Sequence, residues 1–338
     1  MTSDQTGSRV AAVIACYIVP IPLEIIATSL RIYAKQRQAQ GGLDRFTIDD
    51  FFIVFATICA VSECCVGLAY GPPHGFGKHI DQVSAHDFET FEVGNYIFSH
   101  FYNVTLGMIK LSILTFYYRV FVTPVFRKIV LATITFIALW VLTITIVLAL
   151  ECRPIAKFWN PTIPGKCFNL VAFSYFTNIS NLVTDLWIFL LPIPVIWRLH
   201  ITNHQRLGLC GVFLIGLGTC IISSVRISVV VAQGSTDFTW VGVPLGIMSV
   251  FEPLGGILSA NLPITYVLFA NSFRKVRNTV SGTLSGHLKP RGLLSQSSNN
   301  RFGRGQDVED RWIQLDPQTD WSTESKPLAC ATRETEGR

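Results

Sequence analysis

The chain has 338 residues, of which half are apolar and only 14% are charged, and its mean hydropathy is +0.43. Soluble domains carry about 25% charged residues, so this composition excludes an ordinary soluble protein and indicates a membrane protein. The formal net charge of +5 does not indicate nucleic-acid binding, because the basic residues lie beside the apolar runs.

Seven apolar runs are long enough to cross a bilayer, which takes about 20 residues of helix. They are residues 10–32, 49–70, 93–118, 128–150, 172–198, 207–232 and 241–270. The first run is too long for the apolar part of a cleavable signal and contains Glu24, so we expect it to remain as a helix.

The sequence therefore predicts an all-α, polytopic bundle of seven transmembrane helices over residues 10–270. A short extracellular segment, residues 1–9, precedes it. A cytoplasmic tail, residues 271–338, follows it and is rich in Ser, Asn, Gly and charge, which is typical of a mostly disordered segment.

Basic residues beside the runs predict the orientation, because Lys and Arg concentrate in cytoplasmic loops. With the N-terminus outside, the inner loops and the start of the tail hold 12 Lys and Arg, against 5 in the outer segments. We expect the N-terminus outside, the tail in the cytoplasm, and the plasma membrane as the location.

The predicted outer loop between the fourth and fifth runs contains Cys152 and Cys167. Because the outside of a cell is oxidising, we predict a disulfide between them. Two unlinked thiols remain the alternative, and Cys64 and Cys65, near the outer end of the second run, are competing partners.

The second run begins with a capping-box pattern, in which Thr47 precedes the helix and Asp50 follows three residues later. Asp49 and Asp50 also lie at the positive end of the helix dipole. The pattern predicts an inner-end helix cap, with docking of an inner loop by Asp50 as the alternative.

Ionisable residues inside the apolar runs are costly there and are functional candidates. They are Glu24, Glu63, Lys110, Asp185, Arg226 and Glu252. We predict that Arg226 pairs with Glu252. We predict that Lys110 joins a polar network with Asp185 and Asn181, which share one helix face because they are four residues apart. Glu24, at a similar depth, is expected in the same network. Structural pairing without switching remains the alternative.

Other chemistries have weak support. In the known seven-helix photoreceptors, the lysine that forms the retinal Schiff base lies on the last helix. Residues 241–270 contain no lysine, so we expect no cofactor. No protease, hydrolase or phosphate-loop motif indicates an enzyme. His74, His79 and His86 can bind zinc or copper in principle, but their spacing in a Gly/Pro-rich loop is unspecific, and we predict no metal site.

Several segments in order resemble one family. They are "RIYAKQ", "YGPPHGFGKHI", "KLSILTFYYRVF", "CRPIAKFWNPTIPGKC", "NLVTDLWIFLLPIPVIWRL" and "FEPLGGILSANLPI". Over residues 10–275 the chain resembles the fungal rhodopsin-domain integral membrane proteins, a group that includes pathogenicity-related seven-helix receptors and satratoxin-cluster proteins. The resemblance adds Gly75, Gly77 and His79 of the first outer loop to the candidate positions.

The same resemblance implies a function. It implies a receptor-like, GPCR-like protein of filamentous fungi that senses a small extracellular ligand and signals to a cytoplasmic partner, by analogy a heterotrimeric G-protein α subunit. A membrane transporter or accessory protein of a secondary-metabolite pathway is the alternative.

Overall fold

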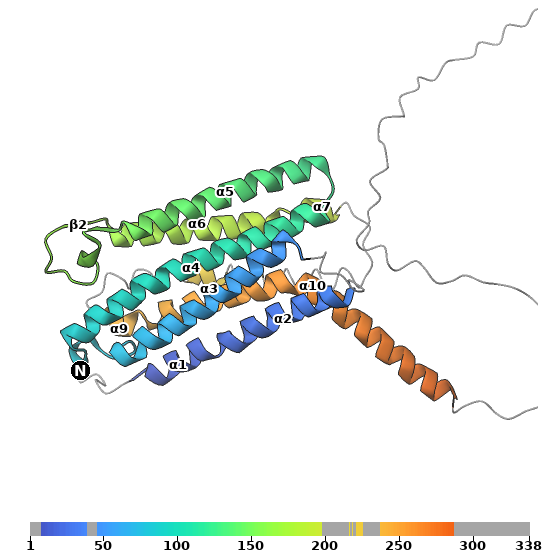
Figure 1. Cartoon of the computed structure of the whole chain (residues 1–338), viewed down its shortest axis with the longest axis horizontal. Coiled ribbons are helices and arrows are strands. Elements are labelled where there is room, and N and C mark those ends of the chain that lie inside the picture. The colour runs from blue at the N-terminus through green and yellow to red at the C-terminus, as the bar shows by residue number, and fades with distance from the viewer. Residues whose placement is uncertain are drawn as a thin grey trace, which may run out of the picture. The chain divides into compact units, whose positions relative to one another are not determined.

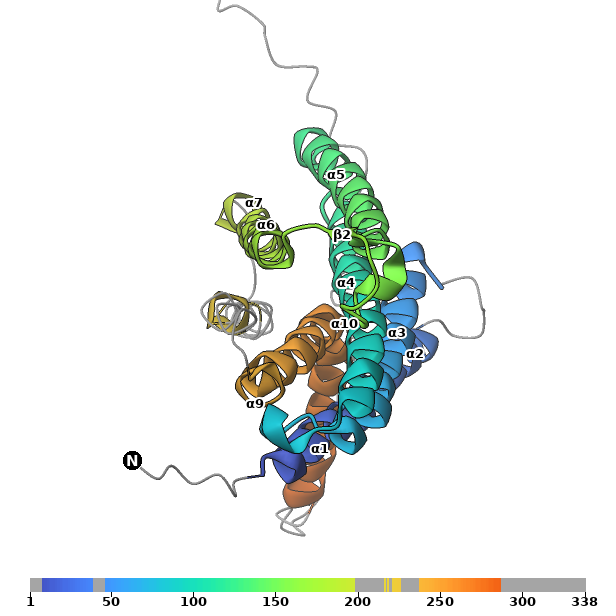
Figure 2. The same cartoon turned by 90° about the vertical axis from the view of Figure 1, so that its left-hand side faces the viewer.

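The computed structural model describes residues 8–38, 46–197, 216, 218, 221–225 and 237–286, with the backbone alone at residues 38, 170, 196, 197 and 267–286. All of these residues belong to one compact unit, Met1–Pro290. The long helices lie alongside one another in a bundle (Figures 1 and 2). The described helices are α1 (Val10–Ile18), α2 (Pro20–Gln38), α3 (Ile48–Tyr70), α4 (Ala85–Val120), α5 (Pro124–Ala149), α6 (Leu170–Leu190), α7 (Ile193–Trp197), α9 (Phe238–Val241) and α10 (Val243–Gly286).

Six helical stretches within the described ranges are long and apolar enough to cross a bilayer. They match the first five predicted runs and the last one, and they confirm the all-helical class. The sixth run, residues 207–232, lies mostly outside the described residues, and its described positions are helical. Val125, Phe136 and Leu139 on the bundle surface are more than half exposed, which suits contact with lipid. The protein is an integral membrane protein with several spans.

Prolines divide the first and fifth spans. Val19 separates α1 from α2, which begins at Pro20. Pro192 lies between α6 and α7. Proline lacks a backbone N–H and clashes with the preceding turn, so it ends or kinks a helix. In contrast, α10 continues through Pro253 and Pro263, as membrane helices can when neighbouring helices satisfy the freed backbone groups.

Two helices are longer than predicted. α4 begins at Ala85 rather than at residue 93, because the Ser84 hydroxyl accepts a hydrogen bond from the Asp87 N–H at 3.1 Å and caps an earlier turn. α10 runs to Gly286, so residues 271–286, the start of the segment predicted as a mostly disordered tail, are helical, and they contain no proline to end the helix. The rest of the tail lies outside the described residues.

α4 occupies the middle of the packing, in contact with α3, α5 and α10. Two glycines allow close approach. A Cβ at Gly94 would lie 2.1 Å from the Tyr70 Cβ of α3, and one at Gly107 would lie 2.3 Å from Val141 of α5. Small residues at such contacts let membrane helices pack tightly. This packing brings Lys110 of α4 within reach of several helices.

One end of the bundle carries a two-stranded hairpin, β1 (Cys152–Arg153) and β2 (Lys166–Cys167), in which Cys152 pairs with Cys167. A disulfide joins these two residues, which confirms the prediction. Cys64 and Cys65 are free thiols, so they do not compete for it. We call this end of the bundle the disulfide end and the opposite end the Arg31 end.

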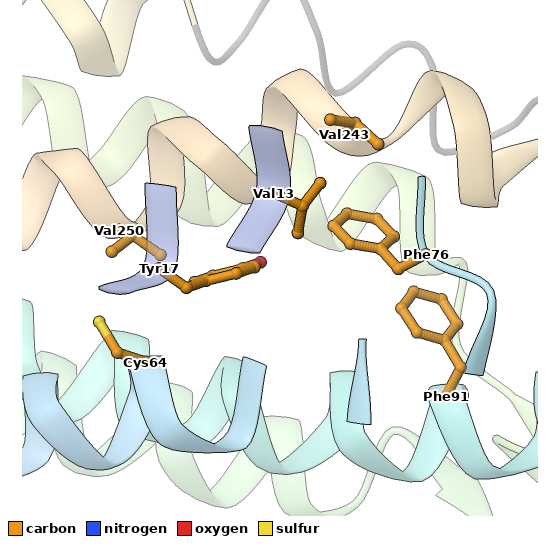
Figure 3. Close-up of a cluster of buried hydrophobic side chains, with 7 residues drawn as sticks. All are labelled: Val13, Tyr17, Cys64, Phe76, Phe91, Val243 and Val250. Atoms are coloured by element: carbon orange, nitrogen blue, oxygen red, sulfur yellow. The ribbon is translucent and has the colours of Figure 1, made fainter. Parts of the chain in front are cut away.

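Three short 3-10 helices complete the described loops at the disulfide end. They are η2 (Pro72–His74), η3 (Ile80–Gln82) and η4 (Ile155–Lys157). Beneath them, a cluster of buried side chains joins α1, α3, α4 and α10 (Figure 3). Its members are Val13, Tyr17, Cys64, Phe76, Phe91, Val243 and Val250.

Candidate functional site

Lys110 is 3% exposed on α4 and is surrounded by groups of α6. Its Nζ donates hydrogen bonds to the Asn181 Oδ1 at 2.6 Å and to the Thr184 Oγ1 at 2.7 Å. It also lies 3.1 Å from the Asp185 Oδ1. The structure therefore brings together the lysine, amide and carboxylate that the sequence suggested. Thr184 was not predicted, although it lies three residues after Asn181 and so on the same helical face.

Glu252 of α10 connects this group to the rest of the core. Its Oε1 accepts a hydrogen bond from the Asn181 Nδ2 at 2.7 Å, and its Oε2 accepts one from the Tyr102 hydroxyl at 2.6 Å. The Ser223 hydroxyl is a further partner. Arg226, the predicted partner, lies outside the described residues, so that pair remains a prediction. We call the joined set of Lys110, Tyr102, Asn181, Thr184, Asp185, Ser223 and Glu252 the Lys110 network.

Glu24 is not joined to the Lys110 network, so this expectation is wrong for the described structure. The side chain is fully buried, and neither carboxylate oxygen has a hydrogen-bond partner among the described residues. The reason is geometric. Glu24 lies on α2, which packs against α3 and α10, whereas α6 lies across the bundle beyond α4 and α10 (Figure 2). Similar depth in the membrane did not imply proximity.

A second polar group lies at the Arg31 end. The predicted capping box is present, with the Thr47 N–H donating to the Asp50 Oδ2 at 3.0 Å. Both carboxylates do more than cap the helix. Fully buried Arg31 donates to the Asp50 Oδ1 at 2.8 Å and to the Asp49 Oδ2 at 2.5 Å. The same guanidinium donates to the Ala260 carbonyl of α10 at 2.7 Å.

Two more cations complete what we call the Arg31 cluster, which comprises Arg31, Lys35, Thr47, Asp49, Asp50 and Arg119. Lys35 Nζ lies 2.5 Å from the Asp50 Oδ2, and Arg119 Nη1 lies 3.2 Å from the Asp49 Oδ1. The cluster thus links α2, α3, α4 and α10. Sequence reasoning counted Lys35 and Arg119 only toward orientation and gave Arg31 no role, although Arg31 and Lys35 are four residues apart and share one face of α2.

The first loop at the disulfide end explains the glycines singled out earlier. Gly75 and Gly77 have φ of 94° and 97°, a left-handed conformation that favours glycine. The Gly77 N–H donates to the Thr239 carbonyl at 3.0 Å. His79 Nδ1 lies 2.7 Å from the Asp237 Oδ2, and its ring stacks on Trp240. These contacts hold the loop against α9.

Two histidines of this loop, His74 and His79, each have a carboxylate partner. His74 Nδ1 lies 3.1 Å from the Asp87 Oδ1. Within the described part of the chain, no group of three or more His, Cys, Asp or Glu side chains is arranged to hold a metal ion.

A cavity of about 400 Å³ opens between the helices on the disulfide side of the Lys110 network. It is lined by residues of α1, α3, α4, α6 and α10, among them Tyr17, Gly67, Tyr102, Asn181 and Ser249. Tyr102 and Asn181 are members of the Lys110 network. We call these two residues the polar floor of the cavity.

A smaller cavity of about 90 Å³ lies on the other side of the network. Lys110, Asp185 and Glu252 line it, as does Ala260, the residue whose carbonyl binds Arg31. The two cavities leave space on both sides of the buried charges. The described fold and site define a polytopic helical membrane protein with a cavity adjoining an intramembrane charge network.

The chain belongs to the fungal rhodopsin domain family, whose model matches residues 30–271. It is 28% identical over 217 residues to a "SAT4 family membrane protein" of Emericella nidulans, covering 62% of this chain and 54% of that protein. It is 32% identical over 122 residues to "Fugralins biosynthesis cluster protein 2" of Gibberella zeae, covering 36% of this chain and 30% of that protein.

A third relative, "Receptor GIN3" of Arthrobotrys oligospora, is 24% identical over 284 residues, covering 82% of this chain and 66% of that protein. The chain thus spans about half the length of the Emericella nidulans relative and under a third of the Gibberella zeae one. The relatives thus include one protein named as a receptor and one named for a biosynthesis cluster.

Proposed function

We propose that this protein is a receptor-like sensor, in which a small molecule binds the 400 Å³ cavity and alters the Lys110 network. One observation carries the proposal. The residues of the polar floor, Tyr102 and Asn181, both line the cavity and hydrogen-bond to Glu252. A ligand that takes either hydrogen bond must change the partners of a buried charge. The role is binding and transmission rather than catalysis.

α10 supplies the route from the cavity to the Arg31 end. Glu252 and Ala260 lie eight residues apart on this helix, about 12 Å along its axis. Glu252 belongs to the Lys110 network, and the Ala260 carbonyl accepts a hydrogen bond from Arg31. A shift of α10 at Glu252 therefore strains the contact between Ala260 and the Arg31 cluster.

Orientation and partner complete the proposal. The disulfide end faces the outside of the cell, as its disulfide and the distribution of basic residues favour. The Arg31 end faces the cytoplasm at the plasma membrane and contacts a G-protein-type α subunit. The relative named as a receptor supports this assignment.

The test compares the wild-type chain with Lys110→Met, each carrying a proximity-labelling enzyme after Arg338 in a filamentous fungus. Lys128→Met is the matched control, because Lys128 is an exposed lysine at the start of α5. We expect the wild-type chain to label a G-protein α subunit more strongly than a membrane control does. Lys110→Met should change the amount of labelled α subunit, and Lys128→Met should leave it at the wild-type level. Equal labelling by all three chains at the background level would refute signalling.

A second candidate is transport, or an accessory role, in a secondary-metabolite pathway. The similarity to a biosynthesis-cluster protein favours it. In the same experiment, this candidate predicts labelled biosynthetic enzymes or vesicle proteins without a G protein. The transport candidate would then be supported if the wild-type chain carried substrate across proteoliposome membranes and Lys110→Met abolished this flux.

A further inference from the structure

The large cavity has an uneven charge. Two of its lining residues, Glu92 of α4 and Glu151 after α5, are acidic, and no Lys, Arg or His occurs among the described residues that line it. Like charges in a cavity walled by apolar groups focus a field of one sign. The electrostatic field inside the cavity therefore favours a positively charged ligand.

Among the described residues, no side chain forms a hydrogen bond or ion pair with the Glu151 carboxylate, and the residue is 8% exposed. Glu92 accepts one long hydrogen bond, 3.4 Å from the Asn95 Nδ2. A buried carboxylate needs a donor or a counter-charge, and the cavity is the space from which one can come.

The Lys and Arg residues of the described loops at the disulfide end do not pair with these two carboxylates. Lys157 Nζ, in the loop that follows Glu151, donates to the Ile163 carbonyl at 2.9 Å. The Arg9 guanidinium lies 4.2 Å from the centre of the Trp240 ring. Arg153 and Lys166 of the hairpin are exposed. None of these four forms an ion pair with Glu151 or Glu92 in the described structure.

The cavity wall is also aromatic, since ten of its lining residues are Phe or Tyr. Phe76 and Phe91 stack with ring centres 5.2 Å apart, and Tyr17 packs edge-on against Phe98 at 6.0 Å (Figure 3 shows Tyr17, Phe76 and Phe91). Aromatic faces attract cations, and several rings together recognise amines and quaternary ammonium groups.

We propose that this cavity binds an organic cation, an amine or quaternary ammonium compound with an apolar or aromatic body. This inference names the ligand class of the proposed sensor and rests on that proposed function. The charged group lies near Glu151 and Glu92, toward the disulfide end. The apolar body extends from there toward the polar floor. Glu92 and Tyr102 are ten residues apart on α4, so this distance is about 15 Å along the helix.

The ionisation of Glu151 agrees with this ligand class. Burial raises the pKa of Glu151 to about 7, so its carboxyl is partly neutral near neutral pH in the empty cavity. A bound cation favours the charged form of a neighbouring carboxyl. The residue can therefore remain in place without a partner and become charged when the ligand arrives.

The test uses the full chain in nanodiscs and three probes of similar shape: benzyltrimethylammonium, its neutral carbon isostere neopentylbenzene, and the anion phenylacetate. Binding is measured by calorimetry and by the shift in thermal unfolding. We expect the ammonium compound to bind at least about tenfold more tightly than the isostere, and phenylacetate not to bind. We expect Glu151→Gln and Glu92→Gln each to weaken ammonium binding about 30-fold or more, as for loss of one partner of a desolvated charge pair.

Glu89→Gln is the matched control, because Glu89 lies three residues before Glu92 on α4 and does not line the cavity. Comparison of the probes on the wild-type chain needs no variant, so poor folding of a variant does not weaken the test. If the isostere or phenylacetate binds as tightly as the ammonium compound, the ligand class is wrong while the cavity remains a binding site. If none of the three binds, the cavity is not a ligand site and the proposed function fails with it.

Discussion

Arg31 gives the sharpest test of the architecture. Arg31→Gln removes a fully buried guanidinium that donates to Asp49, Asp50 and the Ala260 carbonyl. Hydrogen bonds to charged groups contribute about 1.5–3 kcal/mol each. The sum for the three bonds of Arg31 is an upper bound on the free energy of unfolding that Arg31→Gln loses. Both carboxylates keep Lys35, and Asp49 also keeps Arg119. We therefore expect a loss of about 3–5 kcal/mol, the usual cost of breaking a buried ion pair.

The assay is thermal unfolding of the purified chain in nanodiscs, followed by the fraction that remains monodisperse. A loss of that size lowers the midpoint by about 6–20 °C on the scale of domains of 150–250 residues. Arg37→Gln is the control, because Arg37 is exposed on the same helix and contacts only the Tyr33 side chain among the described residues. An Arg31→Gln midpoint equal to that of Arg37→Gln would show that the Arg31 cluster does not hold α2, α3 and α10 together.

Three other measurements test the disulfide end. Burial raises the pKa of Glu151 from 4.5 to about 7. Between pH 4.5 and 7 the folded chain therefore binds more protons than the unfolded chain. The stability that comes from this protonation is complete below pH 4.5 and is lost as the pH rises through 7. Glu151→Gln should flatten that part of a profile of unfolding midpoint against pH; an unchanged slope would assign it to other groups. Cys152→Ser should destabilise the chain by about 3 kcal/mol, the value for a loop of about 15 residues, measured as a lower midpoint that reducing agent does not lower further. Gly75→Ala should cost about 1–3 kcal/mol, because its φ is 94° and the added methyl would lie 2.4 Å from Val83. Gly218→Ala is the control, because Gly218 is helical and an added methyl meets no atom among the described residues, so it should not lower the midpoint.

Local patterns predicted what lies within one helix or one loop. The apolar runs located the described spans, and the capping box at Thr47 is present. The spacing of Asn181 and Asp185 placed both on the face of α6 that meets Lys110. These features depend on helical periodicity and on short loops, which a sequence expresses directly.

Contacts between helices were harder to predict because periodicity does not say which helices are neighbours. Glu24 was assigned to the Lys110 network by depth, yet α2 packs against α3 and α10. Arg31 lies near the end of the first run and was given no role from the sequence, yet it is fully buried between three helices. Tyr102 carries no charge, so the search for intramembrane ions passed over it, although its hydroxyl binds Glu252.

The length of α10 has a mechanical consequence. The helix has 44 residues and is about 66 Å long at 1.5 Å per residue, roughly twice the 30 Å apolar thickness of a bilayer. Its last part projects away from the other helices (Figure 1). From Pro263 to Gly286 it forms a rod about 35 Å long. A bend of about 10° at Pro263 would therefore move the end of the rod by about 6 Å, which makes α10 a lever that enlarges small rearrangements beside Ala260.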